Sequence, residues 1–193
     1  FLMDAPGKRE ELHDMARRIA TVGYYVMLPQ LYYRRTREFV VDGTEDSRNT
    51  MFEHMNSLAN AMVMDDCRAL FAHADTEAAA GDGAAGCVGY CMSGPFAFAA
   101  AAQLAPRMQA SASLHGVRLC IDKDDSPHLD ADKILGEVYF GCAETDEWAP
   151  PEMIEKLGAH LDTAGTNYRI EWFEGTHHGF VFPERGAIYV KDA

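Results

Sequence analysis

Short apolar runs alternate with stretches of helical apolar spacing along almost the whole chain. The runs predict strands at residues 24–28, 86–90, 110–114, 137–141 and 168–173. The helical spacing predicts helices at residues 12–20, 51–80, 95–104 and 150–161. Strands that alternate with helices indicate an α/β fold with a mostly parallel sheet and helices on both faces. The chemistry of such a sheet lies beyond the carboxyl ends of its strands, which tells us where to look for functional residues.

The size and the charge of the chain narrow its class further. With 193 residues it has the length of one domain that can bury its own core, and we expect a single domain over residues 1–193. The sequence contains no run of about 18 apolar residues, so it predicts no membrane span. The net charge of −13 argues against binding to nucleic acid or to an anionic membrane. An odd number of cysteines without a C-x-x-C pair favours reduced thiols and a cytoplasmic location.

Cys91 is the first candidate for a catalytic residue. It lies in the segment Gly89-Tyr90-Cys91-Met92-Ser93-Gly94, between a predicted strand and a predicted helix. A tight strand-to-helix turn lifts a nucleophile above the sheet, and it needs small residues on either side. The helix N-terminus would favour a thiolate, and the Met92 amide would face the oxyanion of a tetrahedral intermediate. Taken alone, the segment fits a buried cysteine in a glycine-rich turn equally well.

Two downstream residues favour the catalytic interpretation. Asp146 and His178 each follow one of the last two predicted strands. The chain order nucleophile, acid, histidine is the order that α/β-hydrolases use. Glu144 or Glu147 would serve equally well as an acid before a helix, and His178 is one of two adjacent histidines. The joint agreement in order and position favours a catalytic triad of Cys91, His178 and Asp146.

The chain resembles the dienelactone hydrolase family over essentially its whole length. The resemblance rests on the segments Gly89–Gly94, Tyr24–Arg34, Ser126–Leu129 and His178–Phe180. It implies a single α/β-hydrolase domain whose Cys–His–Asp triad acts on lactones or related esters without a cofactor. We expect a small-molecule ester or lactone as the partner, and a monomer or small homo-oligomer. No cluster of residues has the spacing of a metal site.

The resemblance also has implications for the ends of the chain and for one loop. It places Phe1–Met3 at the third of the family's eight strands, so two strands and the closing helix after Tyr189 would lie outside this sequence. It gives Ala5 the second oxyanion amide and Asp4 a role in generating the thiolate. The family more often has Glu at the position of Asp4 and Asp at that of Gln30, which concerns the substrate preference more than the triad.

Several residues carry weaker signals. His115 follows a predicted strand, where it would line the substrate pocket or be an ordinary strand-end histidine. Tyr32, Tyr33 and Arg34 are candidates for contact with a substrate carboxylate, although loop aromatics usually cover a core. Because Asp4 is expected in a strand-end loop, replacing it by Asn should lower lactone turnover and leave folding stability almost unchanged.

Besides a redox sensor that uses Cys91, for which the sequence offers no nearby resolving cysteine, two rival functions remain open at the level of the sequence. A general carboxylesterase or thioesterase would use the same triad on unrelated substrates. A non-catalytic binding protein would keep the fold without turnover. Release of the leaving group from an activated aryl ester separates a hydrolase from an inert binder.

Overall fold

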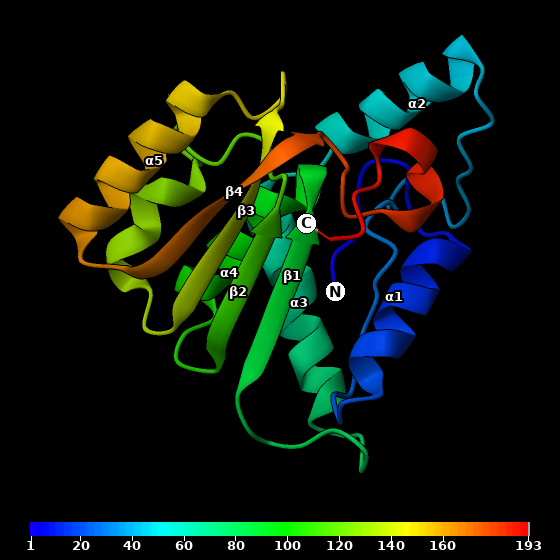
Figure 1. The fold of residues 1–193 in the computed structure, drawn as a ribbon. Helices are drawn as coiled ribbons and strands as arrows, with labels where there is room; N and C mark the ends of the chain where they lie inside the picture. Colours follow the sequence, from blue (N-terminus) through cyan, green and yellow to red (C-terminus); the bar gives the residue numbers. More distant parts are fainter. Residues whose placement is uncertain (193) are drawn as a thin grey trace.

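A computed structural model describes residues 1–192, and its centre is a four-stranded parallel sheet. The strands lie side by side in chain order, as β1 (Ala85–Tyr90), β2 (Met108–Leu114), β3 (Glu137–Thr145) and β4 (Asn167–His177). All three neighbouring pairs are parallel. The carboxyl ends of the four strands therefore lie on one edge of the sheet, where the arrowheads point in Figure 1. The predicted α/β class is confirmed.

Within residues 1–192, five α-helices accompany the sheet. They are α1 (Glu10–Ala20), α2 (Glu45–Asn56), α3 (Asn60–Ala74), α4 (Gly94–Gln103) and α5 (Pro151–Ala164). The prediction of one helix over residues 51–80 was wrong, because the chain leaves the helical conformation between α2 and α3. Ser57 closes α2 with its amide on the carbonyls of Glu53 and His54, and Ala59 is extended, at φ −128°. In Figure 1, α2 lies near the carboxyl edge of the sheet.

The predicted strand at residues 24–28 does not form. Tyr24 is 63% exposed and Tyr25 40%, so this run is not buried on both faces. Its composition suits a strand, but a strand also needs a neighbour with which to share a ladder of hydrogen bonds. Within the described part of the chain, the amino group of Phe1 donates to the Met27 carbonyl at 3.0 Å, and the segment has no ladder of its own.

Helix α4 is the central piece of the core and fixes the position of the turn that precedes it. Every residue from Gly94 to Ala102 is buried. Its alanines allow a close approach to β1 and β2, while Phe98 packs edge-to-face on Phe140 of β3, with ring centroids 5.1 Å apart. Close-packed interiors resist displacement of their elements. The N-terminus of α4 is therefore held rigidly at the carboxyl end of β1.

The helices were compared with the length and apolarity of a membrane span. Among residues 1–192, none of them combines the length and the apolarity that crossing a bilayer requires.

Candidate active site

A strained turn carries Cys91 between β1 and α4. Cys91 has φ +51°, which is rare for a residue with a side chain, and it opens the short 3₁₀ turn Cys91–Ser93. A Cβ atom on Gly89 would lie 2.1 Å from the Ser93 carbonyl oxygen, and one on Gly94 would lie 2.4 Å from the Gly116 Cα. Both positions thus require glycine. The backbone here has the geometry of a nucleophile elbow.

Buried hydrogen bonds tie this turn to the loop after Met3. The Ser93 hydroxyl donates to the Met3 carbonyl at 2.5 Å. The Tyr32 hydroxyl donates to the Ala5 carbonyl at 2.7 Å and lies 3.2 Å from the sulfur of Met92. One buried side chain therefore contacts both residues whose amides are candidates for the oxyanion hole.

Of the two roles expected for Tyr32, contact with a substrate or packing in a core, the structure shows the second. Tyr32 is 1% exposed, so its hydroxyl supports the site from behind and cannot line a substrate surface. Tyr33 and Arg34 both bond the carboxylate of Asp66 on α3, with Arg34 using both of its terminal nitrogens at 2.7 and 2.8 Å. An aromatic residue in a predicted loop gave no signal for this supporting role.

Asp146 and His178 meet beyond the ends of β3 and β4. His178 Nδ1 lies 2.7 Å from Asp146 Oδ2, and the Asp146 carboxylate is almost fully buried. The other carboxylate oxygen accepts the amides of Trp148 and Ala149, at 2.9 and 3.2 Å. The loop of Asp146 thus fixes one oxygen and aims the other at the imidazole ring. A carboxylate held in this way sets the orientation and the tautomer of its histidine.

The neighbouring alternatives do not reach this contact. Glu144 is exposed and accepts the amide of Gly175 at 2.6 Å, and Glu147 is exposed as well. His177 is exposed within β4, whereas His178 turns inward. The structure therefore brings Asp146 and His178 together and leaves the adjacent acids and histidine outside the contact.

The charge state of His178 depends on two partners. Burial lowers its pKa, but hydrogen bonds and charge from Asp146 and Cys91 outweigh burial and raise the pKa to about 9. Because Nδ1 is taken by Asp146, the other ring nitrogen is the one available to the thiol. Such a histidine favours a proton on the imidazole, which is the condition for a thiolate–imidazolium pair.

Asp4 lies just after Met3 and is deeply buried. The carboxylate has no exposed surface and pairs with Arg9 at 2.5 Å and with Arg185 at 2.8 Å. Arg9 also pairs with Glu11 at 2.6 Å. A buried carboxylate between two guanidinium groups is part of the internal structure. We therefore now predict that a substitution of Asp4 lowers stability, in place of the expectation that stability would be almost unchanged.

His115 lies behind His178, away from both cavities described below. The two rings stack edge-to-face, with centroids 4.8 Å apart. His115 is 1% exposed, and neither ring nitrogen has a hydrogen-bond partner within the described residues. Burial, and then the nearby charges of His178 and Arg185, hold its pKa well below the usual range. It is a neutral imidazole in the wall of the site.

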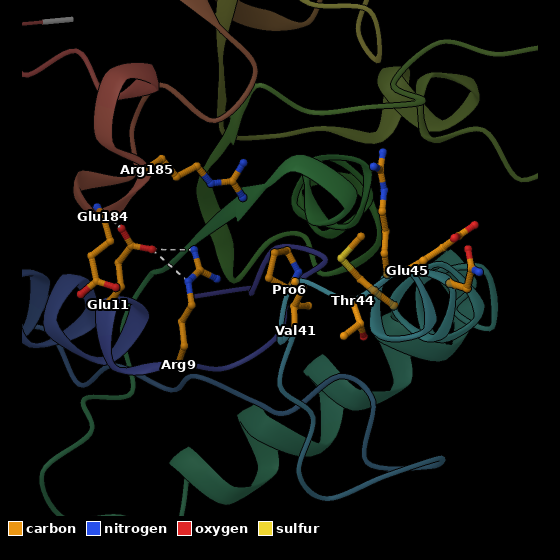
Figure 2. A pocket seen from close by; sticks show the side chains of 12 residues that line it. Pro6, Arg9, Glu11, Val41, Thr44, Glu45, Glu184 and Arg185 are labelled. Atoms are coloured by element: carbon orange, nitrogen blue, oxygen red, sulfur yellow. Dashed lines mark hydrogen bonds and ion pairs between the residues drawn. The ribbon is translucent and has the colours of Figure 1, made fainter.

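Two cavities flank α2. The larger, of about 860 Å³, lies between the N-terminal half of α2 and the loops that carry Pro6, Arg9 and Arg185, as Figure 2 shows. The smaller, of about 360 Å³, lies between the end of α2 and the start of α4, and Met92 forms part of its wall. Phe52 of α2 packs on Trp148, with ring centroids 6.1 Å apart.

The described part of the chain offers no candidate site for a metal ion. No group of three or more His, Cys, Asp or Glu side chains there is arranged to hold a metal ion.

Comparison with known proteins identifies one family. The family model described as the dienelactone hydrolase family matches residues 2–193. A proposed carboxymethylenebutenolidase of Synechocystis sp. is 25% identical over 192 residues, which cover 97% of this chain and 76% of that protein.

Solved structures with the same fold agree with that match. A proposed dienelactone hydrolase of Klebsiella pneumoniae has a TM-score of 0.84 at 22% identity, over 99% of this chain and 78% of that one. The dienelactone hydrolase-like promiscuous phosphotriesterase P91, from metagenomic libraries, has a TM-score of 0.74 at 17% identity, over 99% and 77%. At these identities the two structures establish the fold alone.

Proposed function

Because the chain belongs to the dienelactone hydrolase family and is a carboxylic ester hydrolase, we propose that it cleaves lactones or related esters with Cys91 as nucleophile. The observation that carries the proposal is the 2.7 Å contact between His178 and Asp146, beside a cysteine held at φ +51°. A strained cysteine, an oriented histidine and a buried acid are the three parts that nucleophilic acyl transfer requires.

In the acylation step, His178 holds the thiol proton and the Cys91 sulfur attacks the ester carbonyl. Asp146 keeps the imidazole in the required tautomer and stabilises its positive charge. The amides of Met92 and Ala5 donate hydrogen bonds to the developing oxyanion, and removing one such donor typically costs about 3 kcal/mol of transition-state stabilisation. The imidazolium then protonates the departing alkoxide, which leaves a thioester on Cys91.

In the deacylation step, His178 takes a proton from a water molecule that attacks the thioester. The Cys91 thiolate leaves and is reprotonated, which completes the cycle. A thiolate is a good leaving group, so a poor leaving group on the substrate would lose to return of the thiolate. This favours lactones and activated esters over amides.

The same family membership points to a small-molecule substrate. We also propose a reducing compartment such as the cytoplasm, since all five cysteines are unpaired in the structure.

The test is a pre-steady-state experiment with an activated aryl ester. We expect a burst of aryl alcohol equal to the enzyme concentration and an acyl adduct on the peptide that contains Cys91, located by mass spectrometry. Cys91→Ala should abolish both. Cys142→Ala is the matched control, because this buried thiol lies in β3 away from the turn. A Cys91→Ala protein that retains the burst would refute the proposal.

A lactone screen with the parent protein then separates a lactone hydrolase from a general esterase. We expect the ratio of kcat/KM for an unstrained lactone to that for its open-chain ester to exceed one. A site shaped for a cyclic ester stabilises the transition state of a lactone more than that of a flexible open-chain ester, so this ratio reports the substrate preference.

A further inference from the structure

His115 is held in place by features that leave it little freedom. It follows β2 at φ +40°, and its amide donates to the Gly141 carbonyl at 2.7 Å. Besides the stack on His178, its ring packs against Tyr90, Phe180 and Phe182, with centroids 5.4 to 6.2 Å away. A non-glycine residue at positive φ persists only where its surroundings determine its conformation.

The same residue is costly for the stability of the fold. Both imidazole nitrogens are buried without a hydrogen-bond partner in the described part of the chain. An imidazole always carries at least one N–H, and burying an unpaired polar group opposes folding. A phenyl ring would fill this aromatic environment without that cost. An unsatisfied buried group of this kind calls for an explanation in chemistry.

The charged and titratable groups around the two histidines define what that chemistry is. Asp146, from the loop after β3, and Cys91, from the turn after β1, face His178. Arg185, from the 3₁₀ turn Pro183–Ile188, and the ring of Tyr90 lie near His115. Within this set, His115 contributes no net charge, because burial and its two cationic neighbours keep it deprotonated.

We propose that His115 is a positioning residue for the reaction of His178: its neutral imidazole backs the His178 ring, keeps that ring turned toward Cys91 and supports its protonated form. The inference rests on the proposed function for its relevance to turnover. The edge-to-face stack sets the His115 ring directly against the His178 ring. A neutral imidazole carries a lone pair on its unprotonated nitrogen, and the partial negative charge there favours a nearby cation. A phenyl ring keeps an electron-rich face but has no such lone pair.

The decisive variant is His115→Phe, which keeps an aromatic ring and removes both nitrogens. We expect kcat/KM for an aryl ester to fall about tenfold, and the alkaline limb of its pH profile to move down by about one unit, since one pKa unit is a tenfold change in proton affinity. The melting temperature should stay the same or rise, because two unpaired polar atoms are removed. A merely structural role predicts an unchanged pH profile.

A second variant guards against a Phe that fails to fit. Asn tolerates positive φ better than other residues with side chains, so His115→Asn keeps the backbone and removes the ring. It should also lower kcat/KM and shift the alkaline limb downward. The control is His128→Phe, at a buried histidine that bonds the Ser126 hydroxyl at 2.7 Å and stacks on His160 with centroids 4.7 Å apart. This control should leave the pH profile unchanged.

A readout without turnover separates this inference from the proposed function. The pKa of His178 is measured by NMR titration of the resting protein, in the parent and in His115→Phe. A lower His178 pKa in the variant supports the inference even if no ester is hydrolysed. If both His115 variants fold and keep the parental His178 pKa and pH profile, the proposal is overturned, whatever the substrate.

Discussion

Arg185 donates a 2.8 Å hydrogen bond to the carboxylate of Asp4, a residue 181 positions earlier in the chain. This contact joins the segment that follows His178 to the loop that carries Ala5, so the histidine and the second oxyanion amide are held by one buried ion pair. Arg9 approaches the same carboxylate from the start of α1. Asp4 is therefore the centre of a network that holds the site together.

The first prediction concerns that network. Asp4→Asn should lower the free energy of unfolding by about 2 kcal/mol, because it leaves Arg9 and Arg185 without their buried partner; the value is below the usual range for a buried pair since both arginines are about one-quarter exposed. Lactone turnover should fall as well. Urea denaturation measures the change. Asp14→Asn, at an exposed pair with Arg17, is the control and should change stability by less than about 0.5 kcal/mol.

An unchanged stability of Asp4→Asn would show that the two arginines find other partners. If only turnover falls in that variant, the role of Asp4 lies in the chemistry of the thiol, as the family resemblance implies.

The second prediction concerns the supporting hydroxyl. Tyr32→Phe should reduce kcat by about tenfold, because losing a buried hydrogen bond and leaving the Ala5 carbonyl unpaired costs about 1–3 kcal/mol, part of which is felt in the oxyanion loop. KM should change less. Tyr33→Phe removes an exposed bond to Asp66 and serves as the comparison. Equal rates in the two variants would argue against a role for Tyr32 in placing Ala5.

The third prediction separates two adjacent histidines. His178→Ala should reduce kcat by about 10²–10⁴-fold, which is the usual contribution of general acid–base catalysis. His177→Ala should change kcat by no more than about twofold, since this side chain is exposed and lies outside the contact with Asp146. Steady-state kinetics on an aryl ester measures both. The opposite ranking would move the catalytic base by one position.

The fourth prediction follows from the pKa of His178, raised from 6.5 to about 9 in the folded protein. A group whose pKa is higher when folded stabilises the fold most below its unfolded pKa, and that stabilisation is lost as the pH rises through the folded value. The free energy of unfolding should therefore decline between about pH 6.5 and 9. Urea titrations across this range measure the slope.

Cys91→Ala supplies the control for this pH dependence. It removes one of the two partners that raise the pKa of His178, so the slope should become shallower in this variant. A slope that is the same in both proteins would assign the pH dependence to other groups.

The fold was largely predictable because local signals decide it. Alternating apolar runs located all four strands of the sheet, and the glycines around Cys91 located the turn, since backbone geometry alone demands them. The predictions failed where the outcome depends on contacts between distant segments. Residues 24–28 needed a strand partner, and the break at Ser57 depends on how α2 and α3 pack.

The site shows the same division. The order of Cys91, Asp146 and His178 along the chain is a property of the sequence, and the structure brings the last two into contact. The burial of Asp4 and the hydrogen bond from Tyr32 depend on residues that meet only in the fold. Neither residue spacing nor a local pattern predicts the ion pair between Asp4 and Arg185, which lie 181 positions apart.

The last prediction tests the reactivity of the nucleophile directly. Iodoacetamide should label Cys91 before the other four thiols in a brief reaction at neutral pH. Burial raises the pKa of each of those four, to about 12 for Cys67 and Cys142, which leaves almost no thiolate. Cys91 is half-buried, lies at the start of a helix and has His178 beside it. Peptide mapping of the briefly alkylated protein locates the label.

His178→Ala should slow the labelling of Cys91 by removing the positive charge that favours its thiolate, whereas His160→Ala, on helix α5, should not. Early label on Cys67 or Cys120 in the folded parent would show that accessibility outweighs thiolate character, and it would remove the reason for assigning the nucleophile to Cys91.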